Sequence, residues 1–308
     1  MSMNSKEYNF LSIRYVAMAL SILLMLISLG SLITKGLNKG IDFTGGFLIE
    51  VSYQQAPTIS QVRSDLAIGG FPEAIVQNFG GSKDLMIRIL PREGVDNKAV
   101  GKQIIAILDN SSNKAELRGS EFIDPQVGEE LTDQGGLAMI FALIMIMIYI
   151  IIRFQWKFSI GAVAALIHDV LITIGVFSFF QVSFDLAVLA AILAVIGYSL
   201  NDTIVIFDRI RENFRLLRKT ETLTILNKSI NQTISRTVIT SGTTLLVLCA
   251  LYFIGGKSLE GFSLALIIGV VIGTYSSIYV ATTSIFLLDV STSDLLQVKK
   301  EQIDDGMP

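Results

Sequence analysis

One hydrophobic stretch decides the fold: residues 184–207 read FDLAVLAAILAVIGYSLNDTIVIF. It is long enough to cross a bilayer, because about 20 apolar residues span the hydrocarbon core as a helix. It nevertheless carries Asp202, and an ionised Asp at the centre of a membrane helix costs about 2.5–3.5 kcal/mol on insertion scales. Such a residue faces other helices rather than lipid, so the stretch predicts a bundle of membrane helices with a functional acid inside.

The composition is typical of a protein that crosses a membrane several times. Of 308 residues, 51% are hydrophobic and 17% are charged, and the mean hydropathy is +0.60. Soluble domains carry about 25% charged residues. The net charge of −3 argues against a nucleic-acid partner. A single histidine, His168, and a single cysteine, Cys249, leave no His-rich metal site and no internal disulfide, so no metal or cofactor is expected.

Six stretches are predicted to span the membrane. The first, residues 16–33, is interpreted as an anchor rather than a signal peptide, because its apolar core is too long and no small-x-small cleavage site follows. The other five are predicted at 135–152, 158–180, 184–207, 237–254 and 261–288. The expected units are a tail and first helix (1–34), an outer domain (35–134), five further helices (135–290) and a cytoplasmic tail (291–308).

Basic residues predict the orientation, since short cytoplasmic loops are rich in Lys and Arg. The loop 153–157 carries two basic residues and the segment 208–236 carries seven, whereas 181–183 has none and 255–260 has one. Both termini are therefore expected in the cytoplasm, and the domain at 35–134 on the outer side.

The outer domain has mixed patterning. Residues 47–53, 85–89 and 115–123 are typical of strands, and the segments between them, 58–68 and 98–110, have apolar residues at helical spacing. The predicted fold class is therefore a membrane all-α six-helix bundle with one small α+β, ferredoxin-like outer domain.

The segment GIDFTGG (40–46) opens that domain. Gly40, Gly45 and Gly46 permit positive φ or close backbone approach, and Asp42 lies among them. The residues alone favour a turn between the first membrane helix and the first strand. The last span contains Gly269 and Gly273, a spacing that allows close helix contact.

Polar residues cluster around Asp202 in the sequence. Asn201 precedes it, and Tyr198 and Ser199 lie one helical turn earlier, so they are expected near its face. The fifth span starts with Arg236, the first residue of RTVITSGTT, which also supplies Thr240 and Ser241. Arg236 is either a snorkelling helix end or the ion-pair partner of Asp202, whose charge state could then switch.

The second acid, Asp169, follows His168 in the third span. Adjacent helical residues point in different directions, so these two side chains are not expected to act as one catalytic pair. Asp169 could hold polar partners in the bundle or belong to an ion relay with Asp202. An aspartic dyad needs both acids at one depth, but Asp169 is expected near the middle of the bilayer and Asp202 in the cytoplasmic third of its span. His168 is the sole candidate base for a serine nucleophile, so no catalytic residue is predicted.

The sequence resembles the SecD/SecF family of bacterial protein-export membrane proteins. The matching segments are GIDFTGG (40–46), IVQNFGGSKDLMIRI (75–89), AALIHDV (164–170), IGYSLNDTIVIFDRIREN (196–213), RTVITSGTTLL (236–246) and GGKSLEGFSLALIIGVVIGTYSSIYVA (255–281). They follow one another over nearly the whole chain. The resemblance implies half of an RND-type transporter, located in the bacterial inner membrane.

The resemblance also implies partners and site roles. A SecD partner, the SecYEG channel with the SecA ATPase, YajC and the unfolded translocating polypeptide would assemble with the chain. The proton-motive force would drive late translocation, with Asp202 on the proton path and Arg236 in a related role. The alternatives are an RND-type proton-coupled small-molecule transporter subunit, which six spans and one outer domain disfavour, and a scaffold whose polar residues only pack helices.

Overall fold

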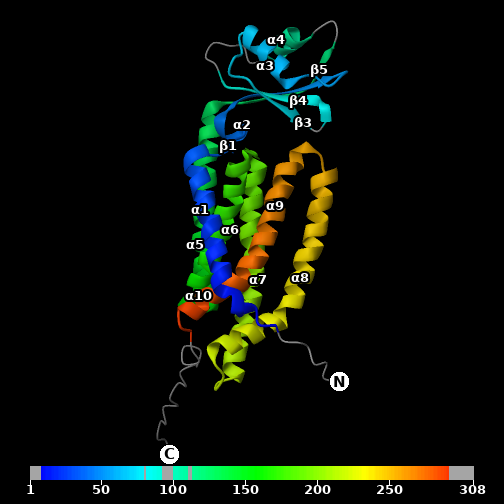
Figure 1. Cartoon of the computed structure of the whole chain (residues 1–308). Coiled ribbons are helices and arrows are strands. Elements are labelled where there is room, and N and C mark those ends of the chain that lie inside the picture. Colours follow the sequence, from blue (N-terminus) through cyan, green and yellow to red (C-terminus); the bar gives the residue numbers. More distant parts are fainter. Residues whose placement is uncertain (1–7, 80, 92–99, 110–112, 291–308) are drawn as a thin grey trace, which may run out of the picture.

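The computed structural model describes residues 8–79, 81–91, 100–109 and 113–290. It has two parts, a bundle of long helices and a small α/β domain at one end of that bundle (Figure 1). The first helix begins and the last helix ends at the opposite end from this domain. The predicted fold class is confirmed.

Six helices in the described part of the chain are long and apolar enough to cross a membrane. The first and the two that follow the outer domain are α1 (Arg14–Lys35), α5 (Pro125–Arg153) and α6 (Trp156–Phe180). The remaining ones are α7 (Leu186–Leu216), α8 (Thr222–Ile254) and the last span, α9 (Lys257–Ser276). A π-helical turn, Ser277–Ala281, follows α9 and leads into α10 (Thr282–Leu287).

Several helices extend beyond the predicted spans. Helix α5 starts ten residues before residue 135, because Asp124 caps it through the Gln126 backbone N–H and Pro125 fits its first position. Helix α7 continues nine residues past 207, and α8 starts at Thr222 instead of 237. Hydropathy detects the part of a helix inside lipid, whereas these extensions pack outside it. The last span, predicted as one helix, contains the π-helical turn.

The outer domain contains a four-stranded antiparallel sheet in the order β3-β4-β2-β5. Its elements are β2 (Gly46–Tyr53), α3 (Ile59–Ile68), β3 (Ile75–Phe79), β4 (Gly81–Ile89), α4 (Val100–Leu108) and β5 (Ala115–Ile123). The succession βαββαβ is the ferredoxin-like arrangement. Both helices cover the face of the sheet that points away from the bundle (Figure 1). Strand β3 was not predicted, and residues 98, 99 and 110 of the predicted second helix lie outside the described residues.

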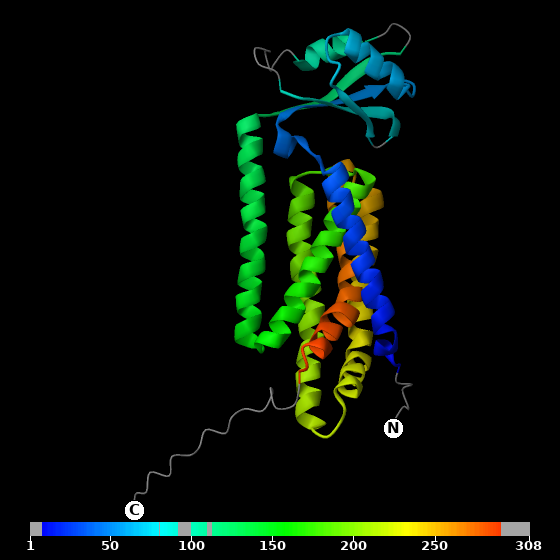
Figure 2. The same ribbon diagram turned by 60° about the vertical axis from the view of Figure 1, so that its left-hand side comes forward.

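Small residues let the central helices approach closely. Helices α7 and α9 pack along each other, and a Cβ on Gly273 would lie 2.9 Å from the Ser199 Cβ. Gly269 faces Val195 of α7 in the same way. The predicted close contact at these two glycines is confirmed within the bundle. By contrast, α5 lies at the edge of the bundle (Figure 2), and little of its apolar surface is buried.

Candidate functional site

Asp202 lies on α7 in a gap between α8 and α9, with only 4% of its surface exposed. Its one hydrogen bond in the described structure comes from Ser241 Oγ of α8, at 3.4 Å from Oδ2. Ser241 Oγ also lies 2.8 Å from Thr274 Oγ1 of α9. A carboxylate can accept about four hydrogen bonds. Asp202 is therefore buried but weakly held.

The predicted ion pair between Asp202 and Arg236 is not formed. Among the described residues Asp202 has no ion pair, and Arg236 is exposed. Helix α8 starts at Thr222, so Arg236 is an interior helix residue and not a helix end, and its side chain is exposed. Thr240 Oγ1 donates to the Arg236 backbone carbonyl at 3.0 Å and makes no contact with Asp202.

The other residues predicted near Asp202 have separate positions. The Tyr198 hydroxyl donates to Thr244 Oγ1 at 3.3 Å, which joins α7 to α8. Asn201 is exposed, and so is Thr243 of α8. Together with Arg236 they place polar side chains on the exposed surface of two helices that are long and apolar enough to cross a membrane.

Asp169 of α6 has no exposed surface and is held from three directions. Oδ2 accepts hydrogen bonds from Ser199 Oγ of α7 at 2.5 Å and from Ser276 Oγ of α9 at 2.8 Å. Oδ1 lies 2.9 Å from Nδ1 of His168. The helical spacing did not predict this contact between neighbouring side chains; a contact of this kind is not by itself a catalytic pair. Ser199, expected beside Asp202, instead binds Asp169.

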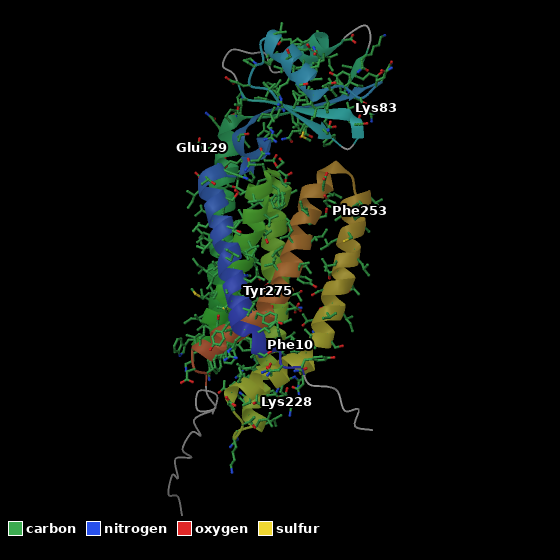
Figure 3. All side chains as sticks on the ribbon, viewed as in Figure 1. Phe10, Lys83, Glu129, Lys228, Phe253 and Tyr275 are labelled. Atoms are coloured by element: carbon green, nitrogen blue, oxygen red, sulfur yellow. The ribbon has the colours of Figure 1, made fainter. Side chains whose placement is uncertain are left out.

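His168 and Tyr275 extend this network to the first helix. The two rings stack with centroids 6.2 Å apart, and the Tyr275 hydroxyl donates to the Ala17 carbonyl of α1 at 2.7 Å. Figure 3 shows Tyr275 between α1 and α9. The other imidazole nitrogen, Nε2, is buried without a hydrogen-bond partner among the described residues. The network thus joins four helices around Asp169.

The segment 40–46 caps the helix that carries Asp202. Asp42 Oδ2 accepts a hydrogen bond from the Leu186 backbone N–H at 2.8 Å, and Asp185 Oδ1 accepts one from Val188 N–H at the same distance. The first N–H groups of a helix have no partner within it, so both acids satisfy donors of α7. Burial raises the pKa of Asp185, and the hydrogen bond from the Val188 N–H partly offsets this rise.

The two glycines that end this segment have no room for a side chain. Gly45 has φ +67° and a Cβ there would lie 2.6 Å from Pro125 Cα, while Gly46 has φ +112° and its Cβ would meet the Ile89 carbonyl. Gly40 also lies against Asp185. The segment is therefore more than the predicted turn, since it joins α5, the sheet and the start of α7.

Arg88 of β4 joins the sheet of the outer domain to the residues just before the segment 40–46 and just before α7. Its Nη1 donates to the Lys39 carbonyl at 2.6 Å and its Nη2 lies 3.4 Å from Ser183 Oγ. These acceptors belong to two short parallel strands, β1 (Asn38–Lys39) and β6 (Ser183–Phe184), which lie before the segment 40–46 and before α7. Arg88 is 6% exposed, and burial lowers the pKa of its guanidinium.

Sequence reasoning missed Arg88, Thr274 and Ser276. A buried arginine inside the alternating apolar strand LMIRI was the available signal for Arg88. For the other two, the polar run TYSS within an apolar span was the signal. In the described residues no group of three or more His, Cys, Asp or Glu is arranged to hold a metal.

Comparison with known families explains this arrangement. The model described as "Protein export membrane protein SecD/SecF, C-terminal" matches residues 103–291, and the "SecD/SecF GG Motif" model matches residues 30–57, which include Asp42 and both glycines. The chain belongs to the SecD/SecF family. It is a multi-pass membrane protein with an accessory role in Sec protein export.

Relatives in this family match over almost their whole length. Protein translocase subunit SecF of Pseudomonas aeruginosa is 51% identical over 300 residues, which cover 96% of this chain and 97% of that protein. The SecF subunit of Vibrio alginolyticus is 49% identical over 307 residues, 98% of each chain.

Solved SecD/SecF-family structures share the fold. SecDF from Thermus thermophilus, described as a translocon-associated membrane protein, has a TM-score of 0.85 and 36% identity over 94% of this chain. SecDF in a "Super-membrane-facing form" gives a TM-score of 0.69 at the same identity and coverage. The match covers 39% of each SecDF chain, so the present chain spans about two fifths of their length.

Proposed function

We propose that this SecD/SecF-family chain couples proton movement through Asp202 to displacement of its outer domain, and so promotes a late step of preprotein export. The observation that carries the proposal is the weakly held carboxylate of Asp202, buried among three helices with a single 3.4 Å hydrogen bond. A buried acid without an ion pair can be neutral at little cost, whereas its ionised form needs a partner.

The exposed Arg236 supplies such a partner in a second arrangement. It lies on α8 five residues before Ser241, which already contacts Asp202. Movement of α8 toward α7 would pair the ionised acid with Arg236, and protonation would release the pair. Two arrangements of similar energy, selected by one proton, are what proton coupling requires.

The outer end of α7 contacts the outer domain, so a movement of α7 at Asp202 would be transmitted to that domain. Asp42 contacts the first residue of α7, and Arg88 fastens the sheet beside it. The two SecDF structures fit this chain to different extents at the same coverage, which supports a family whose parts rearrange.

A SecD partner is supported by the polar surface of α7 and α8. Asn201, Arg236 and Thr243 are exposed on helices that cross the membrane, and polar groups facing lipid are costly. A second six-helix subunit packed here would cover them. We place this pair in the bacterial inner membrane at the SecYEG channel with SecA, with YajC as a further subunit.

The decisive experiment compares Asp202→Asn with Glu221→Gln, which removes an exposed acid at the start of α8. Preprotein export is measured with the native partners present, with and without an uncoupler that collapses the proton gradient. We expect Asp202→Asn to abolish the gradient-dependent part of export and Glu221→Gln to preserve it. Normal gradient dependence in Asp202→Asn would leave only a scaffold role for this acid.

The orientation has its own test. We propose that both termini face the cytoplasm, with the outer domain in the periplasm. Lys83 of the sheet and Lys228 of α8 lie at opposite ends of the molecule (Figure 3). With Cys249 replaced by serine, a cysteine at Lys83 should react with an impermeant thiol reagent in intact spheroplasts, and one at Lys219, in the loop before Lys228, should not. The reverse pattern would invert the proposed topology.

The second candidate is a small-molecule RND-type transporter subunit. The proton site would suit either function, but the outer domain has one four-stranded sheet with two helices, too little to enclose a transport channel. Copurification from mild detergent separates the two: a SecD-like subunit supports export, and a full-length drug pump or no partner argues against it.

A further inference from the structure

A group of arginines surrounds a cavity at the end of the bundle opposite the outer domain. The cavity has a volume of about 490 Å³ and lies between the end of α5 and the extension of α7. Its lining consists of Arg153, Asp208, Arg211, Glu212, Arg215 and Leu216. We call this set the arginine cavity.

The charges of the arginine cavity do not balance. Asp208 Oδ1 lies 3.6 Å from Arg153 Nη2, and Glu212 Oε2 accepts from Arg209 Nη1 at 2.8 Å. Both acids are thus engaged by other arginines. Arg211 and Arg215 have no acidic partner among the described residues.

Arg211 is held in place without being neutralised. Its Nη1 donates to the Arg153 carbonyl at 3.4 Å, and its Nε is buried with no hydrogen-bond partner among the described residues. Arg215 follows at i+4, so the two guanidinium groups lie on one face of α7. Planar guanidinium groups bind phosphate through paired N–H donors. The cavity therefore favours an anion with several oxygen atoms.

The position along the helix indicates the source of this anion. Asp208, Arg211 and Arg215 are 22, 25 and 29 residues after Leu186. They therefore lie about 33, 38 and 44 Å from the outer end of α7, beyond a hydrocarbon core of about 30 Å. Ile152, which precedes Arg153, is 80% exposed, and Trp156, three residues after it, is 59% exposed. Tryptophan is typical of the boundary between lipid and water. The arginine cavity thus opens at the level of lipid headgroups.

We infer that the arginine cavity binds the phosphate of an anionic phospholipid in the cytoplasmic leaflet. Arg211 and Arg215 would receive the phosphate oxygens, while the exposed Ile152, which precedes Arg153 on the membrane side, would contact the acyl chains. The lipid would bridge the inner ends of α5 and α7. This bridge matters because α5 buries little of its apolar surface in the bundle.

The test uses the full chain, with any subunit that copurifies, in nanodiscs of phosphatidylcholine containing a small fraction of fluorescent phosphatidylglycerol. Each arginine near a membrane surface contributes on the order of 1 kcal/mol to binding of anionic lipid. Arg211→Gln/Arg215→Gln should therefore weaken retention of phosphatidylglycerol about 30-fold and leave retention of phosphatidylcholine unchanged. The charge-matched control, Lys219→Gln/Lys228→Gln, should behave like the parent chain.

A second variant keeps the test decisive if the double substitution impairs folding. Glu212→Gln removes a negative charge from the cavity lining and should strengthen retention of phosphatidylglycerol. Free glycerol phosphate at millimolar concentration should not displace the lipid. Equal retention in the arginine and lysine variants, or no preference over phosphatidylcholine, would overturn the proposal. Displacement by free glycerol phosphate or by an acidic peptide would show that the cavity serves a soluble anion or a protein instead.

Discussion

Two aspartates lie in the same bundle within one helical turn of each other in depth, closer than the sequence predicted. Their surroundings nevertheless differ. Ser199, which binds Asp169, lies three residues before Asp202 on α7, a rise of about 4.5 Å. Asp169 receives two serine hydroxyls and faces an imidazole nitrogen. Asp202 receives one hydroxyl at 3.4 Å.

The difference shows that burial alone does not distinguish an acid that packs helices from an acid that could change its protonation state. A fully satisfied carboxylate fixes the helices around it, because moving any of them leaves a buried polar group without a partner. A weakly held carboxylate puts no such constraint on its neighbours. This contrast supports a packing role for Asp169 between α6, α7 and α9, and it is consistent with the proton coupling proposed for Asp202.

The largest expected effect on stability comes from removing the Asp169 carboxylate, which has several hydrogen-bond partners. Asp169→Ala leaves His168 and Ser199 with unpaired buried groups and Ser276 with only its bond to the Gly273 carbonyl. We therefore expect a loss on the order of 3 kcal/mol in the free energy of unfolding. Asp202→Ala should change it by less than about 1 kcal/mol. Thermal unfolding of both variants in the same detergent measures the contrast. Equal losses would remove the distinction between the two acids.

An intermediate effect is expected from separating α9 and α7. In Gly273→Ala the added Cβ would lie 2.9 Å from the Ser199 Cβ, so one helix must shift. Overpacking of this kind costs about 1–3 kcal/mol. The control is Gly242→Ala on α8, where a Cβ meets nothing within 4 Å and stability should be unchanged or higher. If the two alanines unfold alike, α7 and α9 are less tightly packed than described.

The smallest effect distinguishes the hydrogen bonds themselves. Ser199→Ala removes a short bond to Asp169 and should cost about 1 kcal/mol. Ser241→Ala removes the 3.4 Å bond to Asp202 together with the contact to Thr274, whose hydroxyl keeps its bond to the Val270 carbonyl, and should cost less. Chemical unfolding with denaturant resolves the two. A larger loss in Ser241→Ala would mean that Asp202 is held more firmly than its one contact indicates.

Much of the fold was predictable because hydrophobic length and alternation act locally. Six apolar stretches predicted the helices, and FLIEVSY predicted β2 because alternate residues such as Ile49 and Val51 face the core. Strand β3 was missed because it is short, lies at the sheet edge and has no clear alternation. The starts of α5 and α8 were missed because their polar first turns lie outside lipid.

The site was predictable only in part. A charge in an apolar run is visible in one segment, so Asp202 and Asp169 were found. Which serine binds which acid depends on how α6, α7, α8 and α9 are rotated against one another, and the helical spacing of Ser199 pointed to the wrong acid. The cap that Asp42 gives to Leu186 joins residues 144 positions apart, a contact that no local pattern reveals.

The contact between Asp42 and Leu186 also defines one end of a helical segment of α7 whose other end is Asp202. Asp202 lies 16 residues from the capped end of α7, which makes a stiff arm of about 24 Å. A tilt of about 10° around the acid would carry the capped end sideways by about 4 Å over that length. In the proposed mechanism, the lateral displacement of the outer domain would therefore depend on where along α7 the acid lies, and a small angular change at Asp202 would move the outer domain by several ångströms.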